Sequence, residues 1–330
     1  MKRIIYNMLT LLLMGSASLM AQTDPFPDVE YNTQYNMSIT GQVRINGEAL
    51  PDGTIVAVYC HNEIRGKEEV FSQGKRKNVF SLTIKGETEG DPLHFKVFTN
   101  GRIIEVDQGN TFIPDGEIGS LKDYYYIDLP SPVVTTPSAE GWATTCLPFN
   151  AEVPEGINVW NATGVENGEL VMSKVTGNIL PKDTPVLLES TGLTGYEWLS
   201  RVADGDVSTT GSIFQGTTEA TTVDAGSVLT LGHNKETGDI GFWSFTGTTL
   251  PANRAYIATA DVPAGVRGVR IVTEGTTGIL ELDDRTISPS DRSIDNGQAV
   301  HWYSLDGRRL AGTPAASGIY VRQGKKLIIK

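Results

Sequence analysis

The chain has few of the residues, and none of the short motifs, from which sequence-readable active sites are usually built. Its 330 residues include only two cysteines and four histidines. It contains no HExxH metal motif, no CxxC pair, no G-x-S-x-G nucleophile turn and no glycine-rich phosphate loop. At the level of motif, these absences exclude the common zinc-protease, thiol-oxidoreductase, α/β-hydrolase and P-loop classes. A pair of carboxylates that folding brings together stays open, because the chain has 39 acidic residues.

The two cysteines are expected to be free and buried. Cys60 and Cys146 lie far apart in the chain, each within an apolar, strand-like pattern. We therefore predict no disulfide between them, although an exported protein meets an oxidising compartment. His61 follows Cys60 directly, and neighbouring residues of a strand point to opposite faces, so we predict no catalytic thiol–imidazole pair. The other histidines are interpreted as ordinary strand or loop residues: His94, His233 and His301.

Basic residues are also scarce. The chain has 27 Lys and Arg against 39 Asp and Glu, which gives a formal net charge of −12. A nucleic-acid backbone is held mainly by Lys and Arg, so we predict no nucleic-acid partner. The excess of negative charge favours solubility instead.

Long apolar runs are missing except at the N-terminus. There, two basic residues precede an apolar run, and small residues follow it up to Ala21. This order predicts a secretory signal peptide over residues 1–21, cleaved between Ala21 and Gln22. The run is shorter than the roughly 20 apolar residues that a spanning helix needs, and no later segment is long enough, so the chain is not expected to span a membrane after signal removal. Residues 22–33 are interpreted as a disordered leader.

A sustained helical period is absent, and short runs with period-two alternation dominate. Phe80, Leu82 and Ile84 share one face of such a run, and Asn-Gly and Asp-Gly pairs separate the runs. This pattern predicts an all-β fold with two immunoglobulin-like or β-sandwich domains and a short C-terminal β-hairpin domain. The expected boundaries are an N-terminal sandwich at 34–131, a linker at 132–140, a second β-rich domain at 141–282, a linker at 283–298 and a C-terminal hairpin at 299–330.

Two sets of side chains are candidates for ligand binding. Oxygen-bearing residues near one turn form a weak calcium candidate: Asp107, Asn110, Asp115 and Glu117. Their spacing does not match an EF-hand, so a solvated loop is the favoured interpretation and no cofactor is expected. Aromatic residues form the other candidate surface, since exposed rings stack on sugars or anchor protein partners. They are Trp142, Trp160, Trp198, Trp243, Trp302 and the consecutive Tyr124, Tyr125 and Tyr126.

The C-terminal segment differs from the rest of the chain in its charge. After Asp306 it holds six basic residues and no acidic one, and Asp306-Gly307 and Gln323-Gly324 favour tight turns. HWYSLDGRRL followed by GIYVRQGKKLIIK resembles the C-terminal sorting signal of the type IX secretion system, in a short variant without the Pro-Asn-Pro-type segment of longer forms. The matching positions are Tyr303, Leu305, Gly307, Arg308, Gly318, Ile319, Tyr320, Gly324, Lys325, Lys326 and Lys330.

The resemblance of the tail implies passage across the outer membrane of a Gram-negative bacterium, with the type IX machinery as a partner, followed by release or surface attachment. The alternative is a plain terminal hairpin packed on the preceding domain. GWATTCLPFNAEVPEGINVWNATGV, NILPKDTPVLLE and LTLGHNKETGDIGFWSFTGTTLPANRAYI are similar to an all-β module near the C-termini of large secreted and surface proteins of such bacteria. SITGQVRINGEALPDGTIVAVYCHNEIRG resembles immunoglobulin-like or carboxypeptidase-regulatory-like sandwiches.

These observations predict a secreted or outer-membrane-surface, non-enzymatic binding protein of adhesin-like type, with an unknown protein or glycan as its ligand. Two alternatives stay open: a glycan-active hydrolase built on loop carboxylates, and a structural component of a surface assembly. A convergent carboxylate pair in a cleft would indicate the hydrolase. An exposed aromatic platform would indicate glycan binding, and a long unpaired edge strand would indicate assembly by strand addition.

Overall fold

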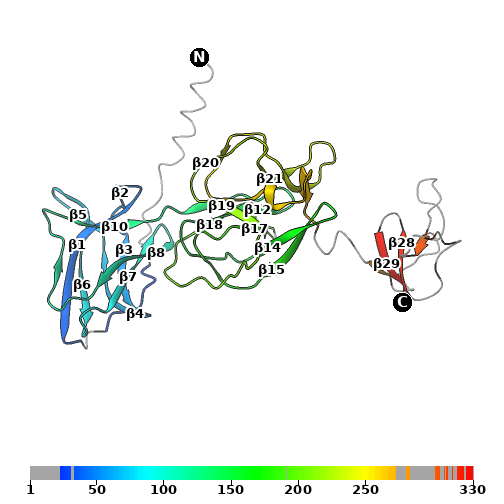
Figure 1. The fold of residues 1–330 in the computed structure, drawn as a ribbon. Coiled ribbons are helices and arrows are strands. Elements are labelled where there is room, and N and C mark those ends of the chain that lie inside the picture. The colour runs from blue at the N-terminus through cyan, green and yellow to red at the C-terminus, as the bar shows by residue number, and fades with distance from the viewer. Residues whose placement is uncertain are drawn as a thin grey trace, which may run out of the picture.

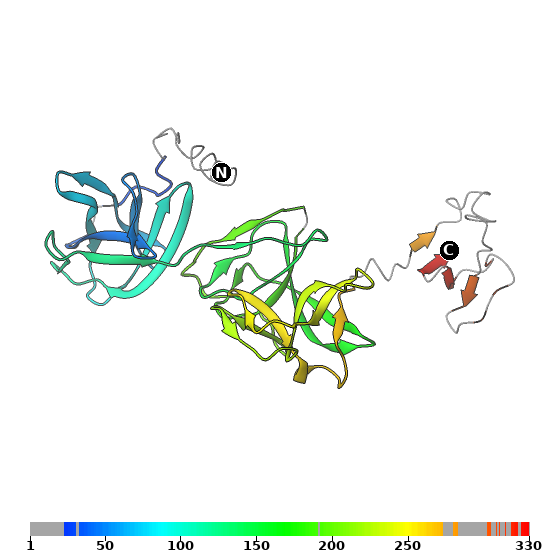
Figure 2. The ribbon, with the colours of Figure 1, turned by 90° about the horizontal axis from the view of Figure 1, so that it is seen from above.

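The computed structural model describes residues 23–30, 33–190, 192–272, 280–282, 302–304, 308, 310, 314, 318–322 and 325–329. This part of the chain consists of β-strands with a single turn of 3₁₀ helix at Thr259–Asp261, and no helix in it has the length and apolar character needed to cross a membrane. The prediction of an all-β fold is confirmed. Figure 1 shows three strand-rich parts in chain order, and Figure 2 shows the same parts from above.

The first part is a sandwich of two sheets. One sheet has the order β10-β1-β6-β5, with β2 and β9 also paired to β1, and the other has the order β4-β3-β7-β8. Its first and last long strands, β1 and β10, lie side by side and run parallel, which ties the two ends of this part together. The strands are β1 (Tyr35–Ile45), β2 (Glu48–Ala49), β3 (Ile55–Cys60), β4 (Glu63–Glu69), β5 (Phe71–Gln73), β6 (Arg76–Gly86), β7 (Pro92–Thr99), β8 (Arg102–Thr111), β9 (Glu117–Ile118) and β10 (Tyr125–Leu129).

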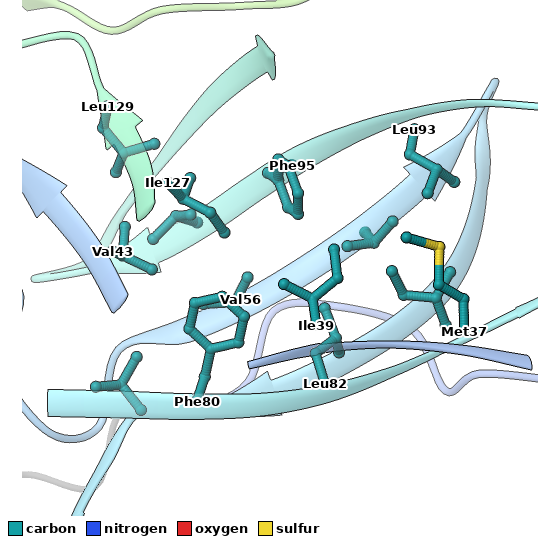
Figure 3. Packing of buried hydrophobic residues seen from close by; sticks show 14 of the residues in the cluster. Met37, Ile39, Val43, Val56, Phe80, Leu82, Leu93, Phe95, Ile127 and Leu129 are labelled. Carbon is teal, nitrogen blue, oxygen red and sulfur yellow. The ribbon is translucent and has the colours of Figure 1, made fainter. Parts of the chain in front are cut away.

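Alternate residues of the facing strands fill the space between the two sheets (Figure 3). Phe80, Leu82 and Ile84 point inward from β6, as the alternation predicts, and each is almost completely buried. Phe95 points toward the same space from β7 in the opposite sheet. Burying one such side chain contributes about 1.5–3 kcal/mol, so this layer is the main stabilising element of the first part.

Residues 23–30 lie on the outer face of the β4-β3-β7-β8 sheet and are not the disordered leader that we expected. Phe26 is only 7% exposed and packs against the outward side chains of β3. The ammonium group of Lys67 binds this segment at three points: Asp24 Oδ2 at 2.7 Å, the Phe26 carbonyl at 3.1 Å and Asp28 Oδ1 at 3.3 Å. We call residues 23–30 the strap. It is ordered because β3 is apolar on both faces and its outer face needs a cover.

A nine-stranded sheet forms the body of the second part, in the order β12-β17-β14-β15-β25-β22-β21-β24-β19. β12, at one end of this order, contacts β24 near the other end, so the sheet curls back toward itself. The strands are β12 (Trp142–Thr145), β14 (Ile157–Glu166), β15 (Glu169–Val175), β17 (Val186–Ser190), β19 (Phe214–Thr217), β21 (Val228–His233), β22 (Ile240–Ser244), β24 (Arg254–Ala258) and β25 (Gly268–Arg270). Three two-stranded pairs flank it: β11 (Val133–Thr135) with β18 (Tyr196–Trp198), β13 (Ala151–Glu152) with β16 (Ile179–Leu180), and β20 (Thr221–Thr222) with β23 (Thr249–Leu250).

The strands β12, β17 and β14 are buried on both faces. Trp142 and Leu187 face the inside of the curled sheet, where Phe242 also packs. Leu188 faces the opposite side, where it packs in a second core with Trp198 of the flanking pairs. Burial on both faces explains why Val186–Ser190 begins with a continuous apolar run rather than an alternating one.

The first two parts also contact each other directly. The Glu105 N–H of β8 donates to the Ser200 carbonyl at 3.0 Å, and the Val202 N–H donates to Glu105 Oε2 at 3.0 Å. The Arg201 guanidinium donates to the Ile103 carbonyl at 2.8 Å. A segment of the second part therefore satisfies the edge of β8, which would otherwise present unpaired backbone groups.

The C-terminal strands form a four-stranded sheet in the order β26-β29-β28-β27. They are β26 (Leu280–Leu282), β27 (Trp302–Ser304), β28 (Gly318–Arg322) and β29 (Lys325–Ile329). β28 and β29 are antiparallel, with Arg322 paired to Lys325. The turn predicted at Gln323-Gly324 lies outside the described residues. β26 runs parallel to β29, so it belongs to this sheet and not to the second domain, in which our boundary at residue 282 placed it.

Candidate functional site

Cys60 and His61, which we expected to point apart, lie in contact. Cys60 Sγ is 3.2 Å from His61 Nδ1. His61 has left the strand, with φ of +54°, so its side chain no longer follows the alternation of β3. The thiol is 2% exposed, and burial raises its pKa, which favours the neutral thiol over the nucleophilic thiolate. The two groups are close, but the thiol is not activated.

Cys60 and Cys146 are both free, as predicted, and both are buried. Cys146 follows β12 in the second part, and burial raises the pKa of its thiol to about 11. Both cysteines therefore behave as small apolar side chains.

The residues of the calcium candidate are not assembled into a site. Asn110 Oδ1 accepts a hydrogen bond from the Tyr125 hydroxyl at 2.6 Å, and Asp107 Oδ1 accepts one from a backbone N–H two residues further on at 2.7 Å. Asp115 lies in a turn with φ of +56°, and Glu117 lies on β9. Within the described ranges, no three His, Cys, Asp or Glu side chains are grouped closely enough to hold a metal ion. Asp107 stabilises a turn and Asn110 binds a neighbouring tyrosine instead.

The aromatic candidates do not form a common platform. Trp198 is completely buried, and Trp142 and Trp302 are each 5% exposed. Tyr126 is exposed, but the guanidinium group of Arg44 stacks on its ring, 3.6 Å from the ring centroid. These rings therefore act mainly as core residues and as partners of cations.

The positions that match the sorting signal fall partly within the described residues. Trp302 packs there against Leu310 and Tyr320. The positions on β27, β28 and β29 are Tyr303, Gly318, Ile319, Tyr320, Lys325 and Lys326, and the Arg308 carbonyl accepts a hydrogen bond from the Ser304 N–H at 2.9 Å. Leu305, Gly307, Gly324 and Lys330 lie outside the described residues, as do His301, Ala21 and Gln22.

A pocket of about 390 Å³ lies in the second part, where the curled sheet approaches itself. Its walls are mainly apolar and aromatic, and the residues that form them are Trp142, Leu231, Ile240, Phe245, Leu250 and Tyr256. The polar side chains in the lining are Thr136, Ser138, Thr144, Thr230, His233 and Arg254. A concave, mostly apolar site with a few polar groups is typical of ligand pockets, whose volumes are roughly 300–1,000 Å³.

The pocket exists because β21 and β24 diverge. The two strands pair at only two positions, the last of which joins Leu229 with Ile257. The same register, continued by two residues, would pair Leu231 with Ala255, but both of these residues line the pocket instead. Alternate residues of a strand direct their backbone groups to the same edge, so Leu231 and Ala255 present their N–H and C=O groups to the pocket.

The free edge of β12 forms the third side of the pocket. β12 is paired only with β17 in the described sheet. On this free edge, Ser138 binds both backbone groups of Trp142. The Ser138 N–H donates to the Trp142 carbonyl at 2.7 Å, and the Ser138 Oγ accepts the Trp142 N–H at 3.2 Å. Two residues further on, the backbone groups of Thr144 face the same way, toward the pocket.

Arg254 is the cation of the pocket, and it lacks a carboxylate partner. Its guanidinium group approaches the Thr144 carbonyl at 3.5 Å, and no carboxylate of the described residues lies within ion-pair distance of it. Other arginines that are also partly buried each pair with a carboxylate, and these are Arg44, Arg65 and Arg201. A partly desolvated cation without a counter-ion is unfavourable, so this position suits an anionic group of a ligand.

A contact between the linker and β21 involves His233, a residue of the pocket lining. His233 Nε2 lies 3.0 Å from Glu140 Oε2, and both side chains are 45% exposed. The hydrogen bond with His233, followed by one with Ser138, lowers the pKa of Glu140. This contact joins the linker to β21 beside the pocket.

Comparison of the chain with protein-family models, with curated proteins and with solved structures finds no match. The pocket is therefore interpreted from its own chemistry. Trp142 and His233 were among the residues considered from the sequence, whereas Arg254 was not. The available signal was a cation at the start of the buried strand RAYIA, in a part of the chain with few basic residues.

Proposed function

We propose that the protein is an exported, adhesin-like binding protein, secreted or held at the outer-membrane surface of a Gram-negative bacterium, and that the pocket of the second part is its ligand site. Export through the type IX machinery is part of this proposal. It is supported by the resemblance of the tail to the sorting signal and by the antiparallel pairing of β28 with β29.

One observation carries the binding function: Arg254, which has no carboxylate partner among the described residues, borders an apolar pocket lined by strand edges that the described sheet leaves unpaired. A cation without a counter-ion, an apolar hollow and open strand edges each raise the free energy of the unliganded protein. A ligand with both an apolar body and polar groups relieves all three. A glycan hydrolase is less well supported. It requires two carboxyl groups about 5–10 Å apart, whereas the residues that line this pocket include no Asp or Glu.

The binding function is tested by blocking the pocket. Gly232 lines the pocket, and a Cβ placed on it meets no atom within 4 Å, so Gly232→Phe adds a large side chain to the pocket lining without a local clash. Gly164 on β14 is equally open but does not line the pocket, which makes Gly164→Phe the matched control. The purified chain from Gln22 onward is screened on glycan and peptide arrays. We expect one class of ligand to bind the parent and the control but not Gly232→Phe, and equal binding by all three proteins contradicts the pocket as the site.

The export part is tested separately in the native host. We expect deletion of residues 300–330 to abolish surface delivery or release, as measured by cell fractionation and by intact-mass analysis of the exported form. Unchanged delivery of the truncated protein contradicts the sorting role and favours a terminal sheet that is only structural.

A further inference from the structure

We infer that the ligand of this pocket is an extended peptide, with a carboxylate held by Arg254 and a neighbouring apolar side chain inserted between Trp142 and Leu231. This inference rests on the proposed binding function and narrows it to one ligand class. The carboxylate has two sources in a peptide, the C-terminus and an Asp or Glu side chain, and the two are separated by the experiment below.

The strand edges favour a peptide over a sugar. Leu231 and Ala255 direct backbone groups into the pocket from two sides, and Thr144 does so from a third. Buried N–H and C=O groups need partners, which in the free protein must be water. An extended peptide offers N–H and C=O groups at the spacing of a strand, and it pairs with an exposed sheet edge by strand addition. Sugar hydroxyls do not repeat at that spacing.

Arg254 favours a carboxylate. A guanidinium group offers several N–H donors in a planar fork that matches a carboxylate in a bidentate contact. Within the described part of the chain, Arg254 uses this capacity in one contact, with the Thr144 carbonyl. The chain as a whole carries −12, which disfavours acidic tracts at long range. One cation in a recessed, apolar site therefore selects a single carboxylate beside an apolar group.

The apolar wall favours a large side chain next to that carboxylate. Trp142 is 5% exposed and lies against Trp160, with ring centroids 6.3 Å apart, so packing restricts its rotamer. Leu231 and Phe245 form the other walls. A volume of about 390 Å³ is small for a ligand pocket and suits the end of a peptide rather than a long oligosaccharide.

A first test needs no ligand. Amide hydrogen exchange is measured residue by residue on the free protein, and the N–H groups of Leu231 and Ala255 are compared with those of the paired Leu229 and Ile257. We expect the first two to exchange at least about tenfold faster, because they have no strand partner. Equal protection of all four amides means that the edges are closed and overturns the inference.

The second test uses three pools of fluorescein-labelled hexapeptides that end in Phe or Leu. One pool has a free C-terminal carboxylate, the second has a C-terminal amide, and the third has the amide together with an Asp or Glu at the penultimate position. Binding of the first or third pool in preference to the second, measured by fluorescence polarisation, supports the inference and identifies the source of the carboxylate. Equal binding of all three pools overturns it.

The third test asks whether Arg254 binds the peptide. Arg254→Gln is expected to weaken binding of the preferred pool by roughly ten- to a hundredfold, since a hydrogen bond to a charged group is worth about 1.5–3 kcal/mol. Arg270→Gln is the matched control, because Arg270 is an arginine of the same sheet that pairs with Glu169 outside the pocket. If Arg254→Gln does not fold, peptides with N-methyl groups at alternate positions give the same test on the parent protein, because they cannot pair with a strand edge.

The failures of the two proposals are distinguishable. If no peptide pool binds but a glycan binds the parent and not Gly232→Phe, the peptide inference is overturned and the binding function stands. If neither peptides nor glycans bind, or if Gly232→Phe binds as well as the parent, the pocket is not a binding site and both proposals fail.

Discussion

The two large β parts treat their exposed apolar surface in opposite ways. In the first part, the strap covers the outer face of the sheet, and Lys67 holds it with Asp24 and Asp28. In the second part, β21 and β24 separate and leave an apolar pocket with unpaired backbone edges. The first part is therefore closed by its own chain, whereas the second is open at the place where a further chain segment would fit.

The partly buried cations differ in the same way. In the first part Lys96 pairs with Glu105 at 2.9 Å, and Glu105 also accepts the Val202 N–H. In the second part Arg254 has no such carboxylate among the described residues. A complete set of partners indicates a structural role, and an incomplete set indicates that a partner comes from outside. The predictions below test this difference.

The largest effect is expected in the core of the first part. Phe80 is completely buried between its two sheets, and Phe80→Ala removes a ring and leaves a cavity. We expect the free energy of unfolding to fall by about 3–5 kcal/mol. Chemical denaturation, followed by far-ultraviolet circular dichroism, measures this free energy. Phe71→Ala, at a position that is 38% exposed, should change the stability by less than about 0.5 kcal/mol. A similar loss in both variants would contradict the assignment of this core.

A smaller loss of stability is expected when the strap is weakened. Phe26→Ala removes the buried side chain that fixes residues 23–30, and we expect a loss of about 1.5–3 kcal/mol. Proteolysis should then cleave the chain near the strap before the sandwich unfolds. Replacement of the neighbouring exposed Pro27 by Ala is the control and should leave both measurements unchanged. Unaltered protease resistance in Phe26→Ala would mean that the strap is not what covers this face.

A pH effect is expected on the same covered face. Burial, followed by the nearby Lys96, lowers the pKa of His94 below its usual value near 6.5. The unfolded chain therefore binds a proton first as the pH falls, and the folded state loses stability below about pH 6.5, down to the lowered pKa. The titratable groups around His94 are Tyr59, His61, Lys96, Glu105 and Asp107.

The His94 contribution is isolated by comparing unfolding midpoints at pH 7 and pH 5. We expect the parent to lose more stability over this interval than His94→Gln, which cannot titrate. An equal loss in the parent and in His94→Gln would show that other groups cause the pH dependence.

The comparison also shows what the sequence could and could not predict. Alternation in NVFSLTIK places Phe80, Leu82 and Ile84 in the core, because the period of a strand decides which face each side chain occupies. The strap was missed, although IVAVYC does not alternate and so implied a cover on both faces of β3. The contact of Cys60 with His61 was missed because a turn with positive φ ends the alternation.

The pocket could not be predicted from local patterns. It depends on the separation of β21 from β24 after two paired positions, and on β12 reaching that gap from about 110 residues earlier in the chain. Strand register and curl arise from contacts between distant segments, and single-sequence periodicity does not contain them. Which carboxylates lie beside Arg254 is likewise a property of the folded chain, and among the described residues there is none within ion-pair distance.

The smallest effect on stability is expected at Arg254, and it separates the two parts most sharply. Arg254→Gln removes a partly buried charge that has no carboxylate partner among the described residues, so we expect the free energy of unfolding to stay the same or to rise, by less than about 0.5 kcal/mol. Arg201→Gln is the matched comparison, because Arg201 is similarly buried but binds Glu152 and the Ile103 carbonyl. Arg201→Gln should lower the free energy of unfolding by about 1–3 kcal/mol, since the Ile103 carbonyl and its neighbours lose a charged donor. Parallel denaturation of the two variants measures the difference. If Arg254→Gln is as destabilising as Arg201→Gln, Arg254 has a structural partner in the folded chain, and the second part is as self-contained as the first.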